Sequence, residues 1–163
     1  MPIAVTHQPS RLSNRTRREW LRRKAEKVLR KLQLQRSDLS ITICDDEYIT
    51  RLNTLWRNIG TTTDVLSFPA SDPSEVRNPD VSGEIPPPLG DIVINLQWLE
   101  RENSGDIQYS LARLFVHGIA HLLGYDHDSE ENALMMKTKE LELMSIVNPE
   151  FCGILDGEKY LVT

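Results

Sequence analysis

The chain has 163 residues, a net charge of −5, and 39% hydrophobic and 26% charged residues. These values are ordinary for a globular protein, and the length fits one domain, residues 1–163, with its own core. No apolar run approaches the roughly 20 residues that cross a bilayer, and no apolar stretch follows the first basic residues as in a secretory signal. The two cysteines, Cys44 and Cys152, imply no disulfide framework. We therefore expect a cytoplasmic protein with no membrane contact.

The first 36 residues form a strongly basic segment. They contain eleven Lys or Arg and two Glu, a net charge of +9, so the remaining residues carry −14. A short strand is expected at residues 3–6, followed by a helix over about 14–33 with apolar residues at helical spacing and basic residues elsewhere. This basic face suits RNA phosphates, but charge on a surface helix is often only solvated, and the sequence leaves both interpretations open.

Strands and helices alternate along the rest of the chain. The patterns predict strands at residues 39–44, 64–68 and 91–95. They predict helices from Asp45-Asp46 to Arg57 and over residues 96–102, 107–123 and 130–146. A Pro-, Asp- and Ser-rich segment at 70–88 is expected to be a loop, and residues 148–163 a C-terminal tail. The predicted fold is α/β or α+β, with about five helices covering a small four-stranded sheet in a single domain.

The most informative motif is HGIAHLLGYDH at residues 117–127. His117 and His121 are four apart, so on a helix they share one face and can reach one ion. Gly124 tolerates the left-handed conformation that ends a helix, so the chain can turn there and return His127 to the same ion. Three protein ligands leave a tetrahedral ion one open position, as in hydrolytic zinc sites. The spacing therefore predicts a catalytic metal site.

The same motif differs at one position from the zinc-protease signature HExxHxxGxxH. Gly118 stands where those proteases have the glutamate that takes a proton from the metal-bound water. Without it, the ion itself or another residue must activate the nucleophile. Peptide hydrolysis by the usual route is therefore disfavoured.

Three further segments stand beside the histidine motif, namely LNTLWR at 52–57, TDVLSFP at 63–69 and the weaker LGDIVI at 89–94. Together the four resemble the YbeY endoribonuclease family over roughly residues 38–147. The resemblance implies a metal-dependent, single-strand-specific endoribonuclease that acts in 16S rRNA 3′ end maturation and ribosome quality control. It also implies a mixed sheet with the metal helix packed centrally and its histidines opening onto a cleft.

The resemblance also implies roles for individual residues and for partners. The family's metal ligands fall on His117, His121 and His127, and its functional arginine on Arg57, so Arg57 and His117 are the catalytic candidates. The expected cofactor is one Zn²⁺. The expected partners are rRNA and the small ribosomal subunit, with ribosomal proteins and a ribosome-assembly GTPase as further candidates. Where the family commonly has a basic residue followed by proline, this chain has the threonines at 61–62.

Several alternatives stay open at this point. Imidazole ligands also suit nickel, copper and iron. The chain could instead hydrolyse a peptide or amide bond, or be a non-catalytic ribosome-assembly factor with a structural metal. The attacking group, a metal-bound water or the RNA 2′-hydroxyl, and the oligomeric state are not determined. Four aspartates are candidates both for orienting the histidines and for capping or turn roles, namely Asp64, Asp91, Asp126 and Asp128.

Overall fold

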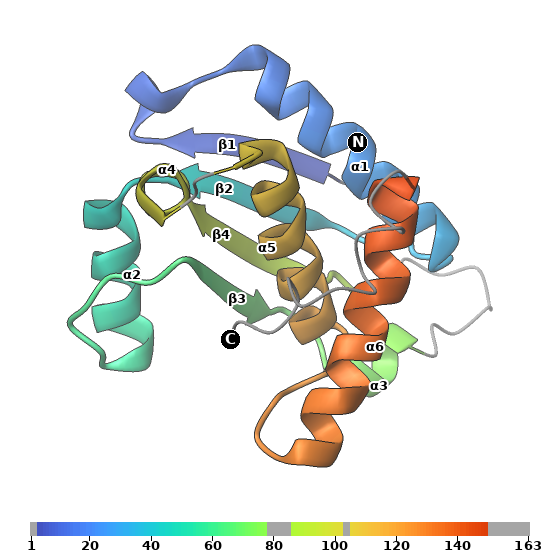
Figure 1. Ribbon diagram of the computed structural model, residues 1–163. Coiled ribbons are helices and arrows are strands. Elements are labelled where there is room, and N and C mark those ends of the chain that lie inside the picture. The colour runs from blue at the N-terminus through green and yellow to red at the C-terminus, as the bar shows by residue number, and fades with distance from the viewer. Residues whose placement is uncertain (1–2, 78–85, 103–104, 150–163) are drawn as a thin grey trace.

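A computed structural model describes residues 3–77, 86–102 and 105–149 of the chain. Its centre is a four-stranded sheet in the order β1-β2-β4-β3 (Figure 1). The strands are β1 (Ile3–Gln8), β2 (Leu39–Cys44), β3 (Val65–Pro69) and β4 (Gly90–Asn95). β1, β2 and β4 are parallel, whereas β3 pairs antiparallel with β4, so the sheet is mixed as expected.

The helices lie on both faces of this sheet. They are α1 (Arg15–Lys31), α2 (Asp46–Arg57), α3 (Pro73–Arg77), α4 (Leu96–Glu102), α5 (Ile107–Leu122) and α6 (Glu130–Val147), with a 3-10 turn η1 (Ser10–Leu12). Side-chain oxygens cap four of them at their N-termini, from Asn14, Asp45, Asp106 and Ser129. Each cap satisfies a backbone N–H that the helix leaves unpaired, which is why the helices begin where they do.

Alternation along the strands divides the core into two layers. Ile41 and Ile92 point to the face that is covered by α1, α5 and α6. Val93 and Phe68 point to the other face, where they pack with Ile49 of α2. β3 is an edge strand, and α5 packs against it and β4. The start of the histidine motif therefore lies beside the β3 edge, while the basic helix α1 packs on β1 at the opposite edge.

The segment at 70–88 contains a helix that the sequence analysis missed. Asp72 accepts hydrogen bonds from the backbone N–H and the hydroxyl of Ser74, and α3 follows as a single turn or so of helix. Val76 is buried against the main core. Asp, Ser and Pro favour turns as well as helix starts, so composition alone predicted a loop. Residues 78–85 of this segment, and residues 150–163 of the expected tail, lie outside the described residues.

Two glycines of the histidine motif fit the chain tightly between neighbouring elements. A Cβ on Gly118 would lie 2.8 Å from the side chain of Ile92, so α5 approaches β4 closely at this point. Gly124 has a φ of +92°, and the N–H groups of Gly124 and Tyr125 bond back to the carbonyls of His121 and Ala120. This is the Schellman pattern that ends many helices. Within the described residues, no helix combines the length and the apolar character needed to cross a bilayer.

Candidate metal centre

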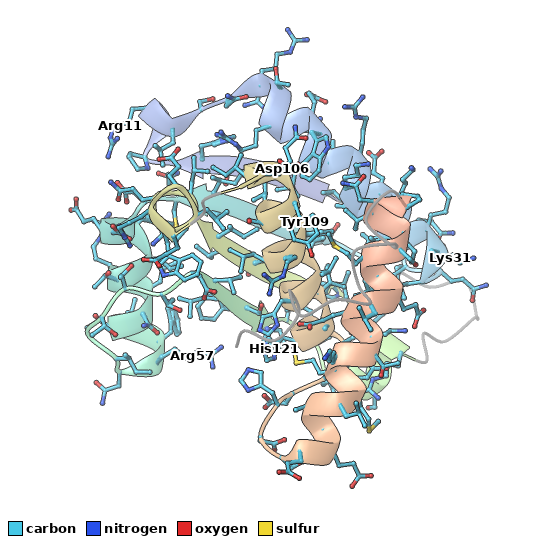
Figure 2. All side chains as sticks on the ribbon, in the orientation of Figure 1. Arg11, Lys31, Arg57, Asp106, Tyr109 and His121 are labelled. Carbon is cyan, nitrogen blue, oxygen red and sulfur yellow. The ribbon has the colours of Figure 1, made fainter. Side chains whose placement is uncertain are left out.

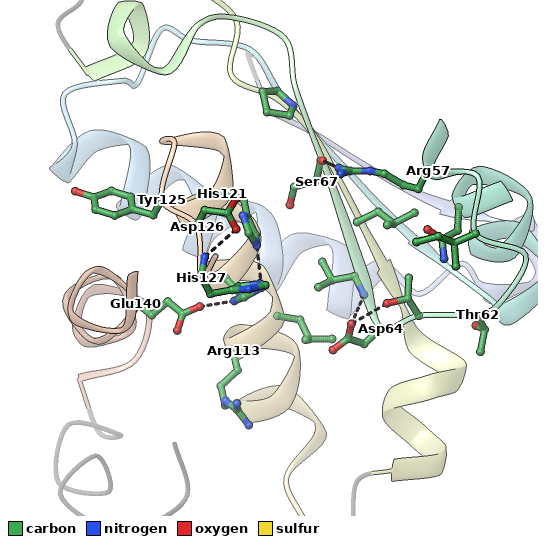
Figure 3. A pocket seen from close by; sticks show the side chains of 18 of the residues that line it. Arg57, Thr62, Asp64, Ser67, Arg113, His121, Tyr125, Asp126, His127 and Glu140 are labelled. Atoms are coloured by element: carbon green, nitrogen blue, oxygen red, sulfur yellow. Dashed lines mark hydrogen bonds and ion pairs between the residues drawn. The ribbon is translucent and has the colours of Figure 1, made fainter. Parts of the chain in front are cut away.

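The last turns of α5 present two histidines on one face. The Nε2 atoms of His117 and His121 lie 3.1 Å apart. His127 follows the turn at Gly124, and its ring centroid is 5.9 Å from that of His117 and 5.4 Å from that of His121. The fold thus brings together the three histidines that the spacing singled out (Figure 3).

Residues of α3 contact the turn that brings His127 back toward the other two histidines. The Nε of Arg77 donates to the carbonyl of Leu123 at 2.6 Å, and its guanidinium lies 5.0 Å from the ring centroid of Tyr125. A Cβ on Gly124 would lie 2.5 Å from Pro73 and 2.7 Å from Arg77, so only glycine fits. The missed helix therefore helps to fix the position of the third histidine.

The three imidazoles fit a single transition-metal ion. One ligand atom of each histidine lies within 4.8 Å of the others. Tetrahedral zinc with bonds of about 2.0–2.1 Å sets two ligand nitrogens about 3.3 Å apart, close to the separation between His117 and His121. Only neutral imidazole can bind a metal, and burial beside the other two imidazoles lowers the pKa of His121, which keeps it neutral. The three histidines could hold a metal, with an open position for a water or a substrate oxygen.

A carboxylate from α6 orients the first histidine. Nδ1 of His117 pairs with Glu140, whose side chain is 16% exposed (Figure 3). This hydrogen bond places the proton on Nδ1 and leaves the lone pair of Nε2 directed toward His121. Metal-bound histidines usually have such a partner. Glu140 was not predicted from the sequence, because it lies 23 positions after His117 and is one of several glutamates in its helix.

Three of the four aspartates that the sequence offered for this role have other partners. Asp126 accepts from the backbone N–H of His127, and Asp128 accepts from the side chain of Asn132. Asp64 accepts from the backbone N–H of Val65 at the start of β3. Asp91 is exposed on β4. Capping and turn contacts therefore describe the first three.

Arg57 lies across a pocket from the histidines. The pocket has a volume of about 730 Å³, and its walls include the loop 61–63, the edge strand β3 and the histidine motif. The Nη2 of Arg57 donates to the carbonyl of Ser67 at 2.8 Å, and the guanidinium lies 5.5 Å from the ring centroid of Phe68. These contacts hold a permanent positive charge at one wall, with the metal candidates at the other (Figures 2 and 3).

Three further observations narrow the chemistry that these residues can perform. A glutamate in place of Gly118 would bring its Cβ within 2.8 Å of the Ile92 side chain, so the general base of the zinc proteases fits at this position only if Ile92 or α5 shifts. Ser67 is buried, and its hydroxyl donates to the carbonyl of Gly118 at 3.4 Å. Cys44 is buried in the α2 layer, where desolvation raises the pKa of its thiol to about 12, so it packs as a core residue and is no nucleophile.

Comparisons with known proteins agree with this picture. The family model of the endoribonuclease YbeY matches residues 3–148. The chain is 36% identical to the endoribonuclease YbeY of Pelotomaculum thermopropionicum over 91% of its own length and 98% of the relative. It is 42% identical to that of Treponema denticola over 76% and 79% of the two chains. The solution structure of TM1509 from Thermotoga maritima shares the fold, with a TM-score of 0.62 and 22% identity over 99% of each chain. The chain belongs to the YbeY endoribonuclease family.

Proposed function

We propose that this protein is a metal-dependent endoribonuclease that cuts single-stranded RNA at the pocket between α5 and β3. The observation that carries the proposal is the convergence of three imidazoles opposite an arginine in one pocket. Membership of the YbeY family supports RNA as the substrate. The ligands in this proposal are His117, His121 and His127, and Zn²⁺ is the ion that best suits three imidazoles in a tetrahedral site.

Arg57 is proposed to bind the phosphate that reacts. Its guanidinium has five N–H donors in a planar fork, and the carbonyl of Ser67 uses an Nη2 donor. The remaining donors can bind two phosphate oxygens and stabilise the charge that develops there. Contact with Phe68 and Ser67 holds the side chain in place before RNA arrives, so little conformational entropy is lost on binding.

His117 is proposed as a metal ligand that is kept in one tautomer. Nδ1 pairs with Glu140, and Nε2 would face a bound ion, so in this proposal His117 would not also transfer a proton. A bound ion would polarise a phosphate oxygen and lower the pKa of a coordinated water to about 7. In this assignment Arg57 contacts the reacting group, and His117 acts through its position.

The proposed biological substrate is 16S rRNA near its 3′ end, in maturation and ribosome quality control in the cytoplasm. The basic face of α1 is a second proposed contact with rRNA on the small subunit. Exposed basic residues follow one another along this element at Arg15, Arg23, Lys27, Arg30 and Lys31. Because α1 packs on β1, at the sheet edge opposite β3, this contact would leave the pocket open. Ribosomal proteins and a ribosome-assembly GTPase are further proposed partners.

The decisive experiment is cleavage of a labelled RNA that spans the 3′ end of 16S rRNA. Wild type is compared with His121→Ala purified identically, because contaminating nucleases would cut in both preparations. Cleavage by wild type alone, abolished by a chelator and restored by added Zn²⁺, is the expected result. Equal cleavage by both proteins would refute the assignment. Binding of the metal-free variant to ribosomes, with normal rRNA ends in cells, would then indicate an assembly factor.

A further inference from the structure

The C-terminal end of α2 and the loop after it expose an unusual amount of apolar surface. Leu55, Trp56 and Ile59 are 72%, 66% and 51% exposed. The three lie within five residues of one another, beside Arg57. Large apolar side chains gathered at the surface commonly mark a binding site. Because these side chains lie near the pocket that is proposed to bind RNA, single-stranded RNA is the candidate ligand of this surface.

Trp56 packs against Phe68 of β3, the strand whose neighbouring residues line the pocket. The rings of Trp56 and Phe68 lie 6.5 Å apart at an angle of 62°, an edge contact that leaves most of the indole in solvent. The guanidinium of Arg57 lies over the same phenylalanine ring, at 5.5 Å. Arg57 and Ile59 line the pocket, whereas Trp56 does not. The indole therefore lies on the α2 side of β3, outside the residues that line the pocket and close to the guanidinium that is proposed to bind phosphate.

We propose that Trp56 stacks on an unpaired base of the RNA, next to the nucleotide whose phosphate Arg57 binds. The inference rests on the proposed function, because it takes RNA as the occupant of the pocket. A flat, exposed indole beside a fixed guanidinium matches the alternation of base and phosphate along a single strand. The guanidinium of Arg57, which lies over the ring that Trp56 contacts, favours a polyanion over an apolar protein surface.

This contact would account for a preference for single strands. A base can stack on a protein ring only after it leaves its own helix, so a paired nucleotide cannot use the site. Every base has a flat face, so the preference would carry little sequence information. Trp56 would then select the form of the RNA, while Arg57 and the histidines act on the backbone.

The test combines protein variants with RNAs that each lack one base. Wild type, Trp56→Ala, Trp56→Phe and the control Leu134→Ala, which alters an α6 residue that is also 66% exposed, are loaded with Zn²⁺. KM, kcat and direct RNA binding are measured for each pairing. Trp56→Ala is expected to raise KM by about tenfold with little change in kcat. Trp56→Phe should recover most of this loss, and Leu134→Ala should match wild type.

The abasic series identifies the base in question. In wild type, removing one base near the cut should raise KM about as much as Trp56→Ala does. In Trp56→Ala, removing the same base should raise KM no further. Equal penalties in both proteins at every position would overturn the inference, as would an unchanged KM for Trp56→Ala. Unchanged RNA binding with altered self-association or altered ribosome binding would instead identify a protein contact and also overturn it. RNA that binds through Trp56 without metal-dependent cleavage would mean that the proposed function had failed and the inference had not.

Discussion

Replacing Glu140 with alanine is expected to weaken metal binding while the protein stays folded. Its carboxylate holds the Nδ1 proton of His117 and is mostly buried. Loss of such a partner lowers metal affinity by about 10- to 100-fold, which is about 1.4 to 2.7 kcal/mol at 25 °C. Glu140→Gln should lose metal affinity by an amount near the lower end of this range, because its amide oxygen can still accept the hydrogen bond from Nδ1 of His117.

The assay is competition for Zn²⁺ against a chelator of known affinity, with thermal unfolding of the metal-free proteins in parallel. Glu142→Gln is the matched control, because Glu142 lies on the same helix, is 54% exposed and pairs with Lys139. We expect Glu142→Gln to equal wild type, Glu140→Gln to bind more weakly, and Glu140→Ala most weakly. Wild-type affinity in Glu140→Ala would refute the idea that this carboxylate positions His117 for a metal.

Three more predictions follow from other parts of the structure. Gly118→Ala should lower the free energy of unfolding by about 1 kcal/mol in urea, because crowding against Ile92 costs about 1–3 kcal/mol and outweighs a helix-propensity gain of up to about 1 kcal/mol. A Gly118→Ala variant more stable than wild type would contradict this and show that Ile92 moves away from the added methyl group at little cost. Arg57→Lys keeps the positive charge but loses the planar fork of N–H donors, so its kcat on RNA should fall about 10- to 100-fold with metal content unchanged. A kcat equal to that of wild type would refute the proposal that Arg57 binds the reacting phosphate. Hydrogen bonds, first from Arg101, lower the pKa of Asp46 to about 2, so its contribution should be present above about pH 4 and disappear as the pH falls through about 2. Acid titration of stability should therefore show wild type losing about 1 kcal/mol more than Asp46→Asn over this range, after allowance for screening, and parallel curves would contradict the assignment.

Much of the fold could be predicted because local patterns are strong. The predicted bounds of the four strands and of five helices lie within about two residues of those in the structure. Alternation in β2 and helical periodicity in α1 reflect burial on one face, which a sequence records directly. The histidine motif could be interpreted in the same way, since the i, i+4 spacing and the helix-ending turn at Gly124 are formed by local backbone hydrogen bonds.

Other features depend on packing between distant segments. Glu140 pairs with His117 only because α6 lies along α5, and no local pattern tells which glutamate of α6 faces the metal candidates. Arg77 holds the end of α5 from a helix so short that its sequence resembles a turn. The sheet order is likewise a matter of long-range pairing, and the sequence analysis left it open. The periodicity of apolar residues within one segment does not predict tertiary contacts of this kind.

The loop at 61–63 shows how a departure from a family pattern can be compensated. Family members commonly have a proline here, which would restrict the backbone by fixing φ, whereas this chain has threonines. The side-chain amide of Asn53 donates to the carbonyl of Thr61 at 2.9 Å, and that of Asn95 donates to the carbonyl of Thr63 at 3.1 Å. The hydroxyl of Thr62 donates to Asp46 at 3.0 Å. Because both asparagines are buried, these bonds can hold the pocket wall in place of a ring. The positive charge of the missing basic residue has no such substitute in the loop, so under the proposed function Arg57 would supply more of the phosphate contact at this wall.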